Sequence, residues 1–135
     1  MARDTGTGRS KAFTLLELML VLTIMTTLVA IAIPIYRGVV IRSNETTLKA
    51  NLHTIRDVID QYTADKKKAP QSLQDLIDAG YFRKELPLDP MTKSHDWQEE
   101  YGTDLTSPDQ TETGIVDVHS LSPEISTDGT PYNTW

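Results

Sequence analysis

A single long apolar run near the N-terminus constrains this chain more than any other feature of its sequence. Residues 15–35 form 21 consecutive positions at which Glu17 is the only ionisable side chain. A helix needs about 20 apolar residues to cross the ~30 Å hydrocarbon core of a bilayer. Basic residues before the run and an acidic remainder after it predict a cytoplasmic N-terminus and an exported C-terminal part.

The charge distribution divides the chain into three segments. Residues 1–12 are polar, and their three basic residues against one acidic residue give a net charge of +2. Residues 13–41 contain only two charged side chains, Glu17 and Arg37, and residues 42–135 have the composition of a soluble domain. We expect a leader over 1–12, a membrane-spanning helix over 13–41 and a soluble head over 42–135.

Composition excludes several functional classes. The 135 residues include 13 Lys and Arg against 19 Asp and Glu, and this acidity argues against binding to nucleic acid. The sequence contains no cysteine, so neither a disulfide nor a thiolate metal site can form. It also contains no nucleophile elbow, phosphate-binding loop or zinc motif. We therefore expect a protein that is not an enzyme.

Glu17 separates three interpretations of the apolar run. A carboxylate inside a membrane helix costs about 2.5–3.5 kcal/mol on insertion scales, and such a residue is functional by default. The residues also leave open a plain membrane anchor, and a secretory signal peptide cut near Ala30-Ile31-Ala32. We favour a functional anchor, because a signal peptide has no use for Glu17.

The residues around Glu17 resemble the processing motif of type IV prepilins. The motif reads Lys11-Ala12-Phe13-Thr14-Leu15-Leu16-Glu17-Leu18-Met19 and continues with Ala30-Ile31-Ala32-Ile33-Pro34-Ile35-Tyr36. The resemblance implies that a prepilin peptidase cuts between Ala12 and Phe13 and methylates the new amine. It also implies the α+β pilin fold, in which a long N-terminal helical spine packs on a small antiparallel sheet. Ala12 departs from the family, which usually has Gly before the cut.

Charge pairing gives this motif a physical role. Cleavage creates an ammonium group on Phe13, whose ordinary pKa of about 7.7–8.0 keeps it mostly charged at neutral pH. The Glu17 carboxylate can pair with this amine in its own or a neighbouring subunit, which relieves the cost of burying an unpaired charge. We expect Phe13 and Glu17 to set the axial register of a filament, and Pro34 to kink the helix or melt it locally.

An apolar stripe at helical spacing follows the membrane segment. It consists of Leu48, Leu52, Ile55, Ile59 and Tyr62. We expect one helix from Phe13 to about Asp65, and a second, short helix with a capping box over 72–77. Strands are expected over 97–101 and 115–119, in a two- or three-stranded antiparallel sheet that packs on the stripe.

The order of elements in the head resembles the major, or G-type, pseudopilins of type II secretion systems. The resemblance rests on Gly80-Tyr81-Phe82, Leu86-Pro87-Leu88-Asp89-Pro90, Ser120-Leu121-Ser122-Pro123 and Thr127-Asp128-Gly129-Thr130-Pro131-Tyr132. It implies a structural subunit that is held in the bacterial inner membrane and assembles into a periplasmic filament, the pseudopilus. It implies as partners further copies of the chain, the prepilin peptidase, minor pseudopilins, and an inner-membrane platform with its ATPase.

Two other functions remain open at this point. One is a type IV pilin or minor pilin for adhesion, motility or DNA uptake. The other is a membrane-anchored periplasmic binding domain that never polymerises.

The resemblance further implies a calcium ion in the C-terminal loop. Glu124 and Asp128 would supply carboxylates and Leu121 a carbonyl oxygen, which are ligands that Ca²⁺ prefers. Where the family has adjacent acidic residues, this sequence has Asp128 followed by Gly129, so one ligand is missing. The alternative, which we favour, is a loop without a required cofactor that is held by turns and by the packing of Pro123, Tyr132 and Trp135.

The histidines are expected at the surface. His53 lies on the long helix, and His95-Asp96 and Asp117-Val118-His119 each lack a third partner at a useful spacing. Asn44-Glu45-Thr46 fits a glycosylation triplet, which we attribute to chance because it falls on the helix.

Overall fold

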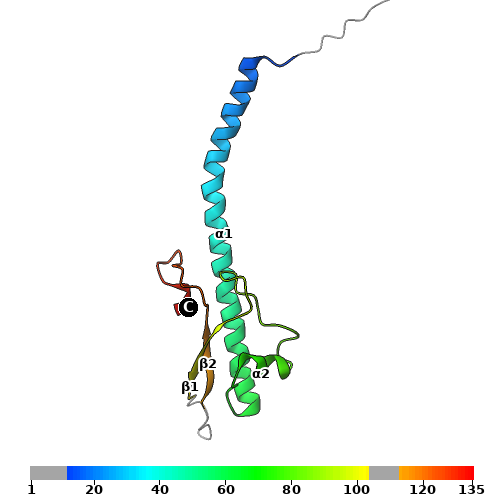
Figure 1. Ribbon diagram of the computed structural model, residues 1–135, viewed down its shortest axis with the longest axis vertical. Coiled ribbons are helices and arrows are strands. Elements are labelled where there is room, and N and C mark those ends of the chain that lie inside the picture. Colours follow the sequence, from blue (N-terminus) through cyan, green and yellow to red (C-terminus); the bar gives the residue numbers. More distant parts are fainter. Residues whose placement is uncertain (1–11, 104–112) are drawn as a thin grey trace, which may run out of the picture. The chain divides into compact units, whose positions relative to one another are not determined.

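The computed structural model describes residues 12–103 and 113–135 (Figure 1). Its elements are α1 (Leu15–Lys66), α2 (Leu73–Asp78), β1 (Gln98–Gly102), β2 (Gly114–His119) and a final 3-10 turn, η1 (Tyr132–Thr134). The chain divides into two compact units, Met1–Gly38 and Val39–Trp135, which are described separately below.

In the first unit, α1 is an isolated apolar helix. All residues from 12 to 38 that the structure describes are exposed, among them Phe13 at 81% and Leu16 at 79%. By length and composition, α1 is able to cross a membrane. The predicted long helix is confirmed, and it continues unbroken through Pro34, so local melting at that residue does not occur in the chain by itself.

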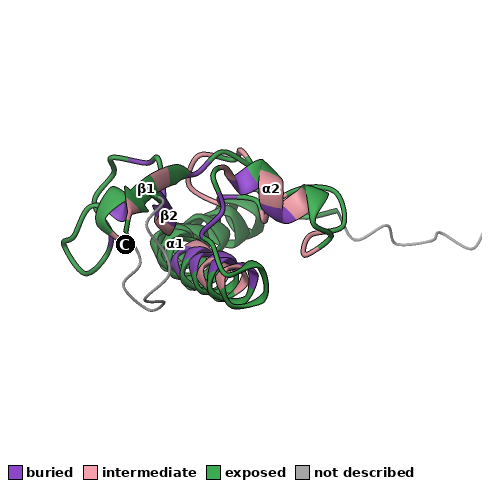
Figure 2. Cartoon of the chain, turned by 90° about the horizontal axis from the view of Figure 1, so that it is seen from below, coloured by how far each residue is buried: buried purple, intermediate pink, exposed green. Residues whose placement is uncertain are grey.

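The second unit, the head, has its own hydrophobic core. The predicted stripe of α1 is buried as expected, and its first residue Leu48 and its middle residue Ile55 are fully inaccessible. Side chains from α2, β2, the residue before β1 and the C-terminal segment complete the cluster: Leu73, Leu76, Trp97, Ile115, Val118 and Tyr132. Buried positions concentrate on α1, α2 and β2, whereas β1 is mostly exposed (Figure 2). The head is thus an α+β unit organised on the C-terminal half of α1.

The short helix α2 lies one residue beyond the expected range of 72–77, at Leu73–Asp78. Ser72 is the N-cap in an extended conformation, and the Asp75 carboxylate accepts the backbone N–H groups of Ser72 and Gln71, at 3.1 and 2.8 Å. Gly80, with φ of +84°, takes the left-handed conformation that follows the helix end. The expected capping box is confirmed.

β1 and β2 form a two-stranded antiparallel sheet. The register runs from Gln98 opposite His119 to Gly102 opposite Gly114, with an irregularity between Glu100 and Tyr101. Each strand differs by one residue from its expected start. β1 begins after Trp97, whose buried side chain donates its Nε1–H to the carbonyl of Pro87 at 3.0 Å.

The start of β2 lies against the segment that follows α1. The backbone N–H of Ile115 donates to the carbonyl oxygen of Pro70 at 2.8 Å. A Cβ added to Gly114 would meet the Ala69 Cβ at 2.5 Å and the Pro70 oxygen at 2.9 Å. The approach requires glycine at 114, and it fixes β2 beside the end of the apolar stripe.

Candidate functional site

The predicted cleavage and methylation residues lie directly before α1. Ala12 and Phe13 are exposed and non-helical, and residues 1–11 of the predicted leader lie outside the described residues. Thr14 begins the helix: its Oγ1 accepts the backbone N–H of Glu17 at 3.1 Å and its carbonyl accepts that of Leu18 at 3.1 Å. Ala12 and Phe13 are therefore accessible directly before a helix whose first turn is already capped by Thr14.

Glu17 lies in the first turn of α1, where a carboxylate interacts favourably with the helix dipole. Within 12–103 and 113–135, no hydrogen bond or ion pair engages its side chain. A carboxylate in a segment apolar enough for a membrane is stabilised by a partner cation, and none contacts Glu17 within the described residues. The structure thus leaves open the pairing that the sequence predicts for Glu17.

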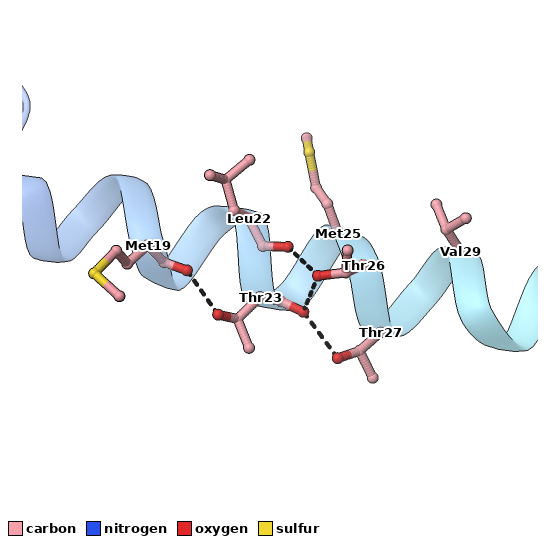
Figure 3. A pocket seen from close by; sticks show the side chains of 7 residues that line it. All are labelled: Met19, Leu22, Thr23, Met25, Thr26, Thr27 and Val29. Carbon is pink, nitrogen blue, oxygen red and sulfur yellow. Dashed lines mark hydrogen bonds between the residues drawn. The ribbon is translucent and has the colours of Figure 1, made fainter.

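A threonine cluster, Thr23, Thr26 and Thr27, follows nearly two turns later on the same helix. Thr23 and Thr27 donate their hydroxyls to the carbonyls of Met19 and Thr23, at 2.7 and 2.8 Å, and Thr26 donates to Leu22 (Figure 3). These hydroxyls are satisfied by the helix itself, so they need no partner in lipid. The patch has no enclosed cavity and belongs to the exposed apolar surface of α1.

In the head, a polar network connects α1 with both strands. The Nε2 of His119 lies 2.9 Å from a Glu100 carboxylate oxygen and 3.9 Å from one of Asp117. Its Nδ1 lies 2.6 Å from the carbonyl oxygen of Trp135. Arg56 of α1 donates to the Asp117 carboxylate and, at 2.9 Å, to the same Trp135 carbonyl. The network ties the C-terminal segment to the helix.

The expectation that His119 lacks a third partner is wrong. Antiparallel pairing places Glu100 opposite Asp117, so the sheet delivers a carboxylate that lies 19 residues away in the sequence. The ligand atoms of Glu100, Asp117 and His119 all lie within 4.8 Å of one another. Because the Arg56 guanidinium already pairs with Asp117, we interpret the group as an ion-pair network and not as a cation site.

The other two histidines have the surface roles expected of them. His53 is exposed and lies 3.2 Å from the carboxylate of Asp57 one turn along α1. His95 is exposed too, with Nδ1 2.7 Å from the Leu86 carbonyl oxygen and Nε2 3.2 Å from Glu85.

Burial lowers the pKa of His119, but the contacts around it outweigh this effect. The hydrogen bonds to Glu100 and to the Trp135 carbonyl, together with the charge of Asp117, raise its pKa above the ordinary 6.5 despite the opposing charge of Arg56. The protonated ring is therefore favoured in the folded head.

The three residues implied as calcium ligands lie on the exposed surface of the C-terminal loop. Leu121 is 47% exposed, and Glu124 and Asp128 are exposed as well. The Asp128 carboxylate lies 3.5 Å from the ammonium of Lys49, which already supplies a positive charge. In the described part of the chain, Glu100, Asp117 and His119 form the one group of three such side chains within ligand distance, and it lies outside this loop.

Sequence reasoning missed three residues that organise the head: Glu45, Arg56 and Glu100. Glu45 has a signal that could have found it, because it lies three residues before Leu48 and so extends the apolar stripe by one turn. Glu100 has no comparable signal, since its role depends on the strand register.

An exposed apolar helix behind a processing motif, followed by a small α+β head, defines a type IV pilin-like protein. The family described as "Prokaryotic N-terminal methylation motif" matches residues 7–33. The chain is 32% identical over 132 residues to type II secretion system core protein G of Klebsiella pneumoniae, and the match covers 86% of each chain. This chain belongs to that family, the major pseudopilins of type II secretion. No solved structure matches it.

Proposed function

We propose that this chain is a major pseudopilin that polymerises into a filament for protein export. α1 anchors it in the bacterial inner membrane with the N-terminus in the cytoplasm and the head in the periplasm. A prepilin peptidase removes residues 1–12 and methylates Phe13. The match to a core protein G over 86% of the chain supports this function over that of a type IV pilin.

The observation that carries the proposal is Glu17, a carboxylate without a partner in the described chain, four residues after the new amine of Phe13. When subunits assemble, the Phe13 ammonium of one chain meets the Glu17 carboxylate of another. An unpaired buried charge is strongly penalised, so only registers that match the two charges are stable. The exposed apolar side chains of α1 supply the remaining packing.

Other parts of the proposal follow from this role. Pro34 lacks a backbone N–H donor inside α1, and it is the place where the helix can bend during assembly. The chain itself performs no catalysis and binds no nucleic acid. Its partners are further copies of itself, minor pseudopilins, and the inner-membrane platform whose ATPase supplies the force.

The substitution Glu17→Ala tests the proposal. It removes the acid that selects the register, so we expect membrane insertion to continue and filaments to be lost. Glu17→Asp, which keeps the charge, is the matched control and should retain part of the filament yield. Mass spectrometry of both mature chains should find N-methylated Phe13 at the N-terminus.

Two outcomes would overturn the assignment. Unchanged filaments from Glu17→Ala would reject the role of the acid. A mature chain that begins near Ile33, or one that retains its leader, would favour a secretory signal or a plain anchor. Deletion of the gene separates secretion from pilus function: loss of export with intact twitching is expected, and the reverse result would indicate a type IV pilin.

A further inference from the structure

Glu45 is one of two carboxylates buried in the described chain, the other being that of Asp89. It lies on α1 beyond the apolar segment, one turn before Leu48, and only 6% of it is exposed. A buried carboxylate is costly unless hydrogen bonds and charges compensate it. Its partners therefore indicate what this position is built to hold.

Those partners come from the C-terminal loop. One Glu45 oxygen accepts the backbone N–H of Thr127 at 2.7 Å and the hydroxyl of Tyr132 at 2.9 Å. The other accepts the Thr127 hydroxyl at 2.6 Å. Both carboxylate oxygens are thus engaged by a segment more than 80 residues further along the chain.

The protonation states of Glu45 and Tyr132 fit a hydrogen bond from the phenol to the carboxylate. Burial alone would raise the pKa of Glu45, but the hydrogen bonds from Thr127 and Tyr132 and the charge of Lys49 hold it below its ordinary 4.5. Burial and the neighbouring Glu45 raise the pKa of Tyr132 to about 12, so the phenol keeps its proton and donates it to the carboxylate.

The loop presents donors toward α1, and this favours an anion over a cation. A calcium site needs converging oxygen lone pairs. Here the N–H and O–H groups of Thr127 and Tyr132 point at Glu45. Two of the nearby carbonyl oxygens are engaged as well: Glu124 O accepts Tyr132 N–H at 2.9 Å and Ser126 O accepts Gly129 N–H at 3.0 Å.

Lys49 supplies the positive charge on the outer side of the same loop. Its Nζ lies 3.5 Å from the Asp128 carboxylate and 4.2 Å from the centroid of the Trp135 ring. Gly129, which follows Asp128, has φ of +83°, a conformation that an acidic residue adopts only with strain. The turn thus fits glycine where the family has a further acid.

We propose that Glu45 closes the C-terminal loop of this head in place of a calcium ion, and that the loop therefore binds no divalent cation. Glu45 holds the inner side of the loop through Thr127 and Tyr132, and Lys49 holds the outer side through Asp128. This inference concerns the stability of the head and does not depend on filament assembly.

Thermal unfolding of the full chain in detergent tests the proposal directly. Tryptophan fluorescence is suitable, because Trp97 lies in the core and Trp135 beside the loop. We expect the same melting temperature in EGTA and in calcium at about 2 mM, above the dissociation constants of many extracellular sites. A stabilising calcium site with a Kd of about 0.1 mM would, at about 2 mM calcium, raise the melting temperature by roughly 7 °C or more, and such a rise would overturn the proposal.

Two substitutions that each replace a carboxylate with an amide distinguish closure of the loop by Glu45 from closure by calcium. Glu45→Gln removes the charge that accepts the loop donors, so we expect a fall of about 5–10 °C and faster proteolysis within residues 121–135. Glu124→Gln changes an exposed carboxylate and should shift melting by less than about 2 °C.

Closure by calcium predicts the opposite order, with Glu124→Gln the more damaging of the two. That order, or a calcium-dependent rise in melting for the parent chain, would reject the proposal. If Glu45→Gln does not fold, the calcium titration of the parent chain and the melting temperature of Glu124→Gln still distinguish closure by Glu45 from closure by calcium. None of these measurements requires assembly, so their failure leaves the proposed filament role in place.

Discussion

At the scale of single residues, His119 joins three parts of the head. It contacts Glu100 of the neighbouring strand and the Trp135 carbonyl, while Arg56 reaches the same carbonyl from α1. Glu100 and Arg56 are charged groups close to the half-buried His119 ring. The stability of the head should therefore depend on pH in a way that can be assigned to this one side chain.

The sign follows from the raised pKa of His119. A group whose pKa is higher in the folded state stabilises it fully below the unfolded value of 6.5, and this contribution is lost as pH rises through the folded pKa. We expect the parent chain to lose stability over this range, and His119→Gln to lose less. Denaturant unfolding at several pH values measures both.

His95→Gln is the matched control, because His95 is exposed and accepts or donates only at the surface. It should keep the pH dependence of the parent. An NMR titration that places the pKa of His119 below 6.5 would contradict the assignment.

Residue roles were predictable where they depend on local sequence and not where they depend on distant partners. Phe13 and Glu17 belong to a contiguous motif, so the sequence indicates both. Glu45 entered the sequence analysis only as part of a glycosylation triplet that was attributed to chance. Its role was missed because its partners, Thr127 and Tyr132, lie on a loop that no local pattern connects to the helix. Periodicity places Glu45 on the buried face, but it does not reveal what meets it.

At the scale of elements, β2 approaches the segment after α1 so closely that position 114 has no room for a side chain. A methyl group at position 114 would come within 2.5 Å of the Ala69 Cβ, and it would disturb the hydrogen bond from Ile115 to Pro70. We expect Gly114→Ala to reduce the free energy of unfolding of the head by about 1–3 kcal/mol, as overpacking commonly does. Thermal or denaturant unfolding measures the loss.

Gly38→Ala is the comparison, since a Cβ at that helical position meets no atom within 4 Å. It should leave unfolding of the head unchanged, or stabilise α1 slightly through helix propensity. Equal effects of the two substitutions would show that the contact at Gly114 does not limit stability.

The elements themselves were largely predictable. The stripe of α1 and the capping box of α2 are repeated or local signals, and both are confirmed. The strand starts were displaced by one residue, because backbone pairing begins at Gln98 and extends to the Gly102–Gly114 pair. Alternation of apolar and polar side chains does not reveal where that backbone pairing begins or ends.

At the scale of the whole molecule, the chain combines an exposed apolar helix with a head that has its own core. We expect removal of residues 1–38 to give a soluble protein that unfolds in one cooperative transition, because the core residues all lie beyond residue 38. Gel filtration and thermal unfolding provide the measurement. A shorter version that starts at residue 47 lacks Glu45 and should melt lower.

Aggregation of the version that starts at residue 39, or a non-cooperative transition, would show that the head needs the membrane segment to fold. This outcome would contradict the division of the chain at Gly38.

The hydroxyls of Thr23, Thr26 and Thr27 affect how a subunit would move between the lipid bilayer and the apolar interior of the proposed filament. Each is already bonded to a carbonyl one turn back along the helix. In the proposed filament, a subunit that moves from lipid into the fibre, or back, therefore has no threonine hydrogen bonds to break. Growth and shortening of that filament could then use one pool of membrane subunits, and the proposed pairing of Phe13 with Glu17 would be the polar contact that changes.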